Sequence, residues 1–222
     1  MSPSLVSADV DWLARALAPA PDDVLREMAE RADRESFPTV GPAVGGWLAA
    51  LVRMTNARRV FEFGSGFGYS AYWIARALPP DGEVVLTEVD GDELDGAREY
   101  FADGDLTDRA RFEHGDALGV IEEVDGPLDL VLIDHEKARY AEAFEAVRGM
   151  VPAGGVLVAD NAGTAGPMDP SDVRALLQGE DRPDASAASR GVARYLDRLR
   201  EAEDFTTGLL PLGEGVAVSV RH

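Results

Sequence analysis

Apolar residues follow two different rhythms along the chain. Before residue 55 they recur at the three- and four-residue spacing of amphipathic helices, which predicts three helices over 10–17, 24–28 and 44–51. From residue 58 onward, short apolar runs rich in β-branched or large side chains alternate with helical stretches. The predicted strands are 58–63, 83–89, 110–114, 128–134 and 155–160, and the predicted helices between and after them are 68–78, 91–102, 116–123 and 136–149.

This alternation, with strands that are apolar along most of their length, is typical of a parallel sheet covered by helices on both faces. The last part of the chain departs from it. A helix near 190–203 precedes two short strands around Gly213-Glu214-Gly215, which predicts an antiparallel hairpin at the end of the sheet. Residues 162–189 are rich in Gly, Pro, Asp and small side chains and are predicted to form a mobile segment with one short helix. We therefore expect a doubly wound α/β fold with a mostly parallel, seven-stranded sheet.

Composition narrows the class of protein. The chain carries 41 Asp and Glu against 21 Lys and Arg, a net charge of −20, which would repel phosphate backbones and argues against a nucleic-acid partner. There is no cysteine, which excludes disulfides and thiolate metal sites. No uncharged apolar stretch of about 18 residues is present, so neither a membrane span nor a signal peptide is expected, and the predicted location is cytoplasmic.

The excess of acidic residues also resembles the composition of proteins from salt-adapted organisms. Mutual repulsion within a surface of charge −20 is screened by dissolved ions, and the Debye length falls from about 10 Å at 0.1 M salt to about 3 Å at 1 M. The melting temperature is therefore expected to rise between low and molar KCl. An unchanged melting temperature would show that the acidity is not an adaptation to salt.

A glycine-rich loop joins the first predicted strand to the next helix. In the sequence FEFGSGFGYS, Gly64, Gly66 and Gly68 allow positive φ and let a ligand approach the backbone, which points to a nucleotide-like ligand. Glu88 ends the next strand about 20 residues after the loop, where a carboxylate can bridge two ribose hydroxyls. Asp116 and Ala117 follow the third strand and are placed either at an adenine edge or, for Asp116, as a helix N-cap.

A second constellation lies at the ends of two later strands. Asp134 ends LDLVLID, and Asp160 and Asn161 end GVLVADN, so three oxygen-bearing side chains meet at one edge of a parallel sheet. Such a set suits Mg²⁺, with Ca²⁺ or Mn²⁺ as alternatives. Lys137 follows Asp134 by one helical turn and is the single lysine among 21 basic residues. Because an ammonium can lose its proton and a guanidinium effectively cannot, Lys137 is a candidate for proton transfer.

These motifs resemble those of class I S-adenosylmethionine (SAM)-dependent methyltransferases from about residue 37 to the end of the chain. IDHEKARY followed by ADN further resembles the cation-dependent O-methyltransferases, the family of catechol and caffeoyl-CoA O-methyltransferases. The resemblance implies one Rossmann-like methyltransferase domain over 1–222, with helices in 1–55 covering the site and the core in 56–222. It also implies a homodimer as one possible assembly.

The resemblance assigns a role to each candidate residue. Glu62 and the backbone at Gly64 and Gly66 would hold the methionine part of SAM, Ser70 and the Val40 backbone its carboxylate and amine ends, Glu88 the ribose, and Asp116 and Ala117 the adenine. Asp134 would border the cofactor and, with Asp160 and Asn161, bind the metal, and Lys137 would be the general base.

The acceptor is left open by the sequence. A small aromatic molecule with vicinal hydroxyls fits the family best, although catechol methyltransferases carry a substrate-binding glutamate before the final hairpin where Gly208 and its neighbours stand here. Two alternatives stay open: a non-catalytic SAM-binding module, and another adenosyl-cofactor transferase such as an aminopropyl transferase. His135 is expected to pack beside the metal, and Trp12, Trp47 and Trp73 are expected in the core.

Overall fold

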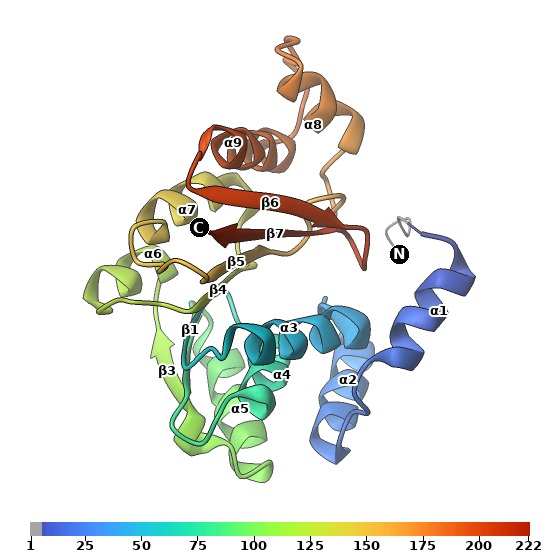
Figure 1. Ribbon diagram of the computed structural model, residues 1–222. Coiled ribbons are helices and arrows are strands. Elements are labelled where there is room, and N and C mark those ends of the chain that lie inside the picture. Colours follow the sequence, from blue (N-terminus) through green and yellow to red (C-terminus); the bar gives the residue numbers. More distant parts are fainter. Residues whose placement is uncertain (1–5) are drawn as a thin grey trace.

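Within residues 6–222, seven strands form a single sheet. They are β1 (Arg59–Phe63), β2 (Glu83–Glu88), β3 (Ala110–His114), β4 (Leu130–Ile133), β5 (Val156–Ala159), β6 (Phe205–Leu210) and β7 (Val216–Arg221). In this computed structural model, which describes residues 6–222, the strand order is β3-β2-β1-β4-β5-β7-β6 (Figure 1). Strands β1 to β5 are parallel, whereas β7 runs antiparallel to both β5 and β6. The predicted mostly parallel sheet with a C-terminal antiparallel hairpin is confirmed.

Helices pack against both faces of the sheet. They are α1 (Ala8–Leu17), α2 (Asp23–Glu35), α3 (Gly41–Thr55), α4 (Tyr69–Ala77), α5 (Gly91–Asp103), α6 (Ala117–Val120), α7 (Tyr140–Val147), α8 (Pro170–Leu177) and α9 (Ala187–Glu201), with 3-10 turns η1 (Thr107–Arg109), η2 (Ile121–Glu123) and η3 (Lys137–Arg139). Helices α3, α4 and α5 lie on one side of the sheet, and α6, α7 and α9 on the other (Figure 1). The helix predicted over 136–149 begins as the tighter turn η3, a frequent way for an α-helix to start.

The alternation of side chains along each strand produces two cores. On β4, Leu130 and Leu132 belong to the core shared with α2 to α5, whereas Val131 and Ile133 belong to the core shared with α6, α7 and α9. Both sets are fully buried. Strands β1, β2, β4 and β5 each contribute to both cores and are apolar along most of their length, as the sequence pattern predicted, whereas β3 and β6 at the two edges of the sheet are more polar and exposed.

The register of the central strands brings their carboxyl ends to one edge. Phe63 of β1 pairs with Ile133 of β4, and Ile133 pairs with Ala159 of β5. The strand order also reverses between β1 and β4, and in open α/β sheets ligands bind outside the carboxyl ends of the strands at such a point. The residues that follow these three strands therefore form the natural place for a site.

The N-terminal helices differ from the expected core packing. Trp73 on α4 is buried as predicted, but Trp12 is 67% exposed and Trp47 is 42% exposed, so their predicted burial is wrong. Helix α1 has no buried residue and lies beside the main body rather than within it (Figure 1). Helical spacing of apolar residues identifies one apolar face, but it does not determine whether another element covers that face.

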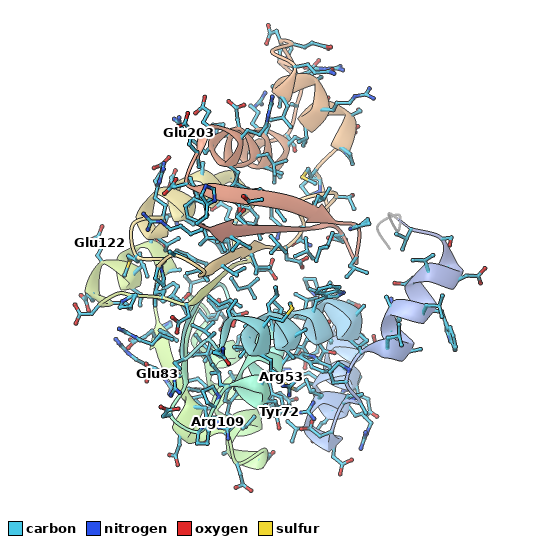
Figure 2. The ribbon with its side chains drawn as sticks, viewed as in Figure 1. Arg53, Tyr72, Glu83, Arg109, Glu122 and Glu203 are labelled. Carbon is cyan, nitrogen blue, oxygen red and sulfur yellow. The ribbon has the colours of Figure 1, made fainter. Side chains whose placement is uncertain are left out.

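Charged side chains cover the periphery of the molecule. Glu83, Glu122 and Glu203 are exposed and extend from its outer surface (Figure 2). Within residues 6–222, none of the helices has both the length and the apolar character needed to cross a membrane.

Candidate active site

The glycine-rich loop connects β1 to α4 with three residues in the left-handed region. The φ angles of Gly64, Gly66 and Gly68 are +79°, +51° and +84°. The loop is also crowded: a Cβ added to Gly64 would lie 2.7 Å from the carbonyl oxygen of Asp134, and one added to Gly66 would lie 2.6 Å from Cζ of Phe37. Both the backbone conformation and the lack of space require glycine, as the sequence predicted.

Glu88 is fixed beside this loop by backbone donors. Its Oε2 accepts the N–H of Gly66 at 2.8 Å, and its Oε1 accepts the N–H groups of Val89 and Asp90 at 2.7 and 2.9 Å. Three backbone hydrogen bonds therefore orient one carboxylate at the end of β2. Glu88 therefore lies next to the glycine loop, and its contact with a ribose stays a prediction.

Glu62 is a fully buried acid on β1. Ser70 at the start of α4 donates a hydrogen bond to its Oε1, while Oε2 has no hydrogen-bond partner in the structure. Burial raises the pKa of Glu62 to about 8, although the hydrogen bond from Ser70 acts in the opposite direction. The raised pKa favours the protonated carboxyl, and a cationic group placed beside Oε2 would favour its ionised form.

This burial predicts a pH-dependent stability. Between pH 4.5, the ordinary pKa of Glu, and about 8 the folded state holds a proton that the unfolded state has lost, so the free energy of unfolding should fall as pH rises through this range. The total loss is on the order of a few kcal/mol, at 1.36 kcal/mol per pKa unit. Chemical denaturation of Glu62→Gln should show a flatter pH dependence, whereas the exposed Glu122→Gln should behave as the parent protein. Equal slopes in both variants would contradict the assignment.

Asp116 acts as a helix N-cap, one of the two alternatives open from the sequence. Its Oδ1 accepts the N–H of Leu118 at 3.1 Å at the start of α6. Its Oδ2 accepts a hydrogen bond from Arg139 at 2.9 Å, and this hydrogen bond lowers the pKa of Asp116. Ala117 is buried beside it. The contact of Asp116 and Ala117 with adenine stays a prediction.

Val40 precedes α3 near the turn of the C-terminal hairpin. A Cβ added to Gly213, whose φ is +55°, would lie 3.2 Å from Cγ2 of Val44 and 4.0 Å from the carbonyl oxygen of Val40. The start of α3 and the β6–β7 turn therefore meet.

Asp134 and Asp160 lie side by side at the ends of adjacent strands. Each directly follows one of the paired residues Ile133 and Ala159. Among residues 6–222, Oδ1 of Asp160 is buried without a hydrogen-bond partner, and burial together with the charge of Asp134 raises the pKa of Asp160 to about 8. Burial likewise raises the pKa of Asp134. Two desolvated acids that repel each other are a fitting site for a cation, which would neutralise both.

The third predicted ligand is an amide rather than an acid. Within residues 6–222 no group of three or more His, Asp or Glu side chains could hold a metal ion by itself, so the predicted set depends on the side-chain oxygen of Asn161. Asn161 has a φ of +55°, and its Nδ2 donates to Oε2 of Glu214 at 2.7 Å. The donor set is hard and oxygen-based, which fits Mg²⁺.

Glu214 is the polar residue of this region that the sequence interpretation missed. It lies in the β6–β7 turn, and its carbonyl oxygen accepts the N–H groups of Gly163 and Thr164. The position considered from the sequence, Gly208, lies within β6 opposite Val218. The available signal was that Glu214 is the one acid in the turn between the last two predicted strands. Its charge contributes to the raised pKa values of Asp134 and Asp160.

Lys137 reaches the acidic pair from the turn η3. Its Nζ donates to Oδ1 of Asp134 at 3.3 Å, and the two side chains are 23% and 22% exposed. Its Nζ also lies 5.7 Å from the ring centre of Tyr140, whose hydroxyl donates to the carbonyl oxygen of Asp160 at 3.1 Å. The predicted proximity of Lys137 to Asp134 is thus present, and the Lys137 side chain is partly exposed.

His135 packs against aromatic rings rather than hydrogen-bonding. Its ring is stacked on Tyr140 with centroids 5.5 Å apart, and neither ring nitrogen has a hydrogen-bond partner in the structure. Burial lowers the pKa of His135 to about 4, so the ring is neutral at pH 7.

Comparison with known proteins identifies the family. Residues 19–222 match the O-methyltransferase family. The chain is 31% identical over 149 residues to a catechol O-methyltransferase of Niastella koreensis, an alignment that covers 65% of this chain and 67% of that protein. It also resembles the structure of the O-methyltransferase TomG from Streptomyces achromogenes in complex with SAM, with a TM-score of 0.82, 27% identity and 96% of each chain covered. A methyltransferase from Geobacter sulfurreducens gives a TM-score of 0.79 at 26% identity, with 100% of this chain and 98% of that chain covered.

The match extends over the glycine loop, the strand-end acids and the hairpin alike, so the non-catalytic and aminopropyl-transferase alternatives are set aside. The chain belongs to the O-methyltransferase family and is a SAM-dependent O-methyltransferase that acts on a small-molecule acceptor.

Proposed function

We propose that the enzyme methylates one hydroxyl of a small aromatic acceptor with vicinal hydroxyls, and that a divalent cation, Mg²⁺ in the first instance, assists the reaction. The observation that carries this proposal is the juxtaposition of Asp134, Asp160 and Lys137. Asp160 has a buried oxygen that no group in the described part of the chain hydrogen-bonds, Asp134 adjoins it, and Nζ of the single lysine of the chain lies 3.3 Å from Oδ1 of Asp134. Two adjacent acceptor oxygens are the geometry that a cation at this edge would chelate.

The cation would be held by Asp134, Asp160 and the side-chain oxygen of Asn161. When bound, it would supply Lewis-acid charge that makes an acceptor hydroxyl more acidic. Glu214 accepts from Nδ2 of Asn161, which leaves the amide oxygen directed away from Glu214. Such an outer contact orients a ligand residue toward its metal.

The SAM site would be formed by the glycine loop, Glu62, Ser70, Val40 and Glu88, with Asp116, Ala117 and Asp134 bordering it. SAM supplies an electrophilic methyl group on a sulfonium. The part played by these residues is positioning, because holding two reactants in line can contribute about 7–11 kcal/mol to lowering the barrier. Lys137 would take the proton of the acceptor hydroxyl at Nζ.

The role of Glu88 is tested by cofactor binding alone. Glu88→Ala removes a carboxylate held by three backbone N–H groups and is expected to weaken binding of SAM by about 10- to 100-fold, which corresponds to one charge-assisted hydrogen-bonding group. Isothermal titration calorimetry measures this directly. Exposed Glu83 at the opposite end of β2 provides the control, Glu83→Ala, which should bind as the parent does. Undiminished affinity in Glu88→Ala would refute the ribose assignment.

The acceptor class is tested by a screen of vicinal diphenols with labelled SAM, in the presence of Mg²⁺ or of EDTA. Methylation of diphenols but not of the matching monophenols, and only with the cation, supports the proposal. Equal activity on monophenols in EDTA would contradict both the chelation and the acceptor class. The homodimer and the cytoplasmic location stay predictions, the first to be checked by the solution mass.

A further inference from the structure

The turn η3, which carries Lys137, is too short to define its own position. It consists of three residues, and within it the N–H of Tyr140 bonds to the carbonyl oxygen of Lys137. The preceding contact is a single bond from Arg139 N–H to the carbonyl oxygen of Glu136. The position of the Lys137 backbone therefore depends on α7, which this turn begins, and on the elements packed against the turn.

Helix α9 contacts this turn through Gly191. A Cβ added to Gly191 would lie 2.2 Å from the carbonyl oxygen of Lys137 and 2.5 Å from Cα of Ala138, distances at which something must move. Gly191 does not have a positive φ, and glycine is a poor helix former. Glycine is thus required at this position for space: it lets the backbone of η3 rest directly on the helix.

Arg194 holds the same turn from the next position on the same helical face. Its guanidinium donates to the carbonyl oxygen of Ala138 at 3.0 Å. Residues three apart in a helix lie on one face, so Gly191 and Arg194 contact η3 from the same face of α9. On the other side of the turn, the guanidinium of Arg139 donates a hydrogen bond to Oδ2 of Asp116 at 2.9 Å.

We propose that Gly191 and Arg194 are positioning residues that set Lys137 against the strand-end acids. The inference rests on the base role of Lys137 in the proposed function. Neither residue reaches the reacting atoms; each acts through the backbone of η3. A shift of this backbone moves Nζ relative to Asp134, and a displacement of about 1 Å from a reactive geometry can cost about 100-fold in rate.

The first test uses NMR to detect a change in the surroundings of Lys137 and does not depend on enzyme activity. Because Lys137 is the single lysine of the chain, protein labelled with ¹⁵N- and ¹³Cε-lysine gives one lysine backbone amide signal and one Cε signal. Gly191→Ala and Arg194→Ala should shift both signals. Two matched controls should leave them in place: Gly155→Ala, whose added Cβ would lie 2.7 Å from Val151, and Arg198→Ala, whose partners are Glu145 and Glu201.

The second test separates positioning from general stability by kinetics. Gly191→Ala should lower kcat by about 10- to 100-fold with little change in the KM for SAM. In a Lys137→Arg background the same substitution should cost less than about two-fold, since the group that it positions is no longer a base. The controls should not change kcat in either background.

The proposal would be wrong if the lysine signals did not move in Arg194→Ala and Gly191→Ala. It would also be wrong if Gly191→Ala lowered kcat as much in the Lys137→Arg background as in the parent protein. Arg194 is exposed, so its variant keeps the test valid if Gly191→Ala does not fold. If the parent protein methylates no diphenol, the proposed acceptor and cation fail, and the labelling experiment still decides whether α9 positions Lys137.

Discussion

Replacing Lys137 by arginine is expected to lower kcat by about 10²- to 10⁴-fold, the usual contribution of a general base. Arginine keeps the positive charge beside Asp134 but cannot accept a proton at working pH. The affinities for SAM and for the cation should change little, because the charge is retained. Steady-state kinetics with a weakly acidic diphenol, together with calorimetry for SAM, provide the measurement.

Two comparisons make this prediction specific. The deficit should shrink for acceptors whose hydroxyl is already acidic, since they need less help in losing the proton. The reverse exchange at a distant exposed position, Arg198→Lys, should leave kcat unchanged. Turnover near the parent level in Lys137→Arg with a weakly acidic diphenol would show that Lys137 orients the acceptor rather than taking its proton.

Asp160→Asn is expected to act in opposite directions on activity and on stability. It removes one of two predicted carboxylate ligands, so activity with Mg²⁺ should fall to the level that the parent protein shows in EDTA. Without a cation the same change should stabilise the fold, because Asp160 is a buried acid whose pKa is raised to about 8 by burial and by Asp134. The stabilisation should grow as pH rises from 3.8, the ordinary pKa of Asp, to about 8, because the folded parent holds a proton over this range that its unfolded state has lost; above about 8 it should level off.

Activity assays with and without EDTA and thermal melts of the metal-free protein at pH 6 and 9 check both parts. The exposed acid Asp108 gives a control, Asp108→Asn, which should alter neither property. Full activity of Asp160→Asn with Mg²⁺ would remove the cation from this site. A destabilised metal-free variant would show that the carboxylate supports the fold without a cation.

The parts of the fold that could be predicted are those encoded over short distances. Strand–helix alternation gave the sheet, and the spacing within FGSGFG and IDHEK placed Gly64, Asp134 and Lys137 correctly relative to their own strands. The predicted hairpin was likewise local, being two apolar runs around Gly213-Glu214-Gly215. In each case the signal for an element lies within that element or its immediate neighbours in the chain.

The missed features depend on contacts between distant segments. Glu214 reaches Asn161 across 53 positions, and Arg194 reaches Ala138 across 56. No local spacing encodes which carbonyl an arginine will meet. The predicted burial of Trp12 is wrong for the same reason. Periodicity identifies an apolar face of α1, but whether that face is buried depends on which other elements pack against it.

The strand order determines when the contacts around Asn161 can form during synthesis of the chain. Strand β7 is the last of the seven to be made, yet it is inserted between β5 and β6. Until it emerges, β5 has an open edge, Asn161 lacks Glu214, and the N–H groups of residues 162–164 lack the carbonyl groups of the β6–β7 turn. A nascent chain stalled before this turn would already contain the glycine loop and Glu88. Asn161 and residues 162–164, in contrast, can make their contacts with the β6–β7 turn only when translation has passed it, so the two parts of the candidate site become complete at different points of synthesis.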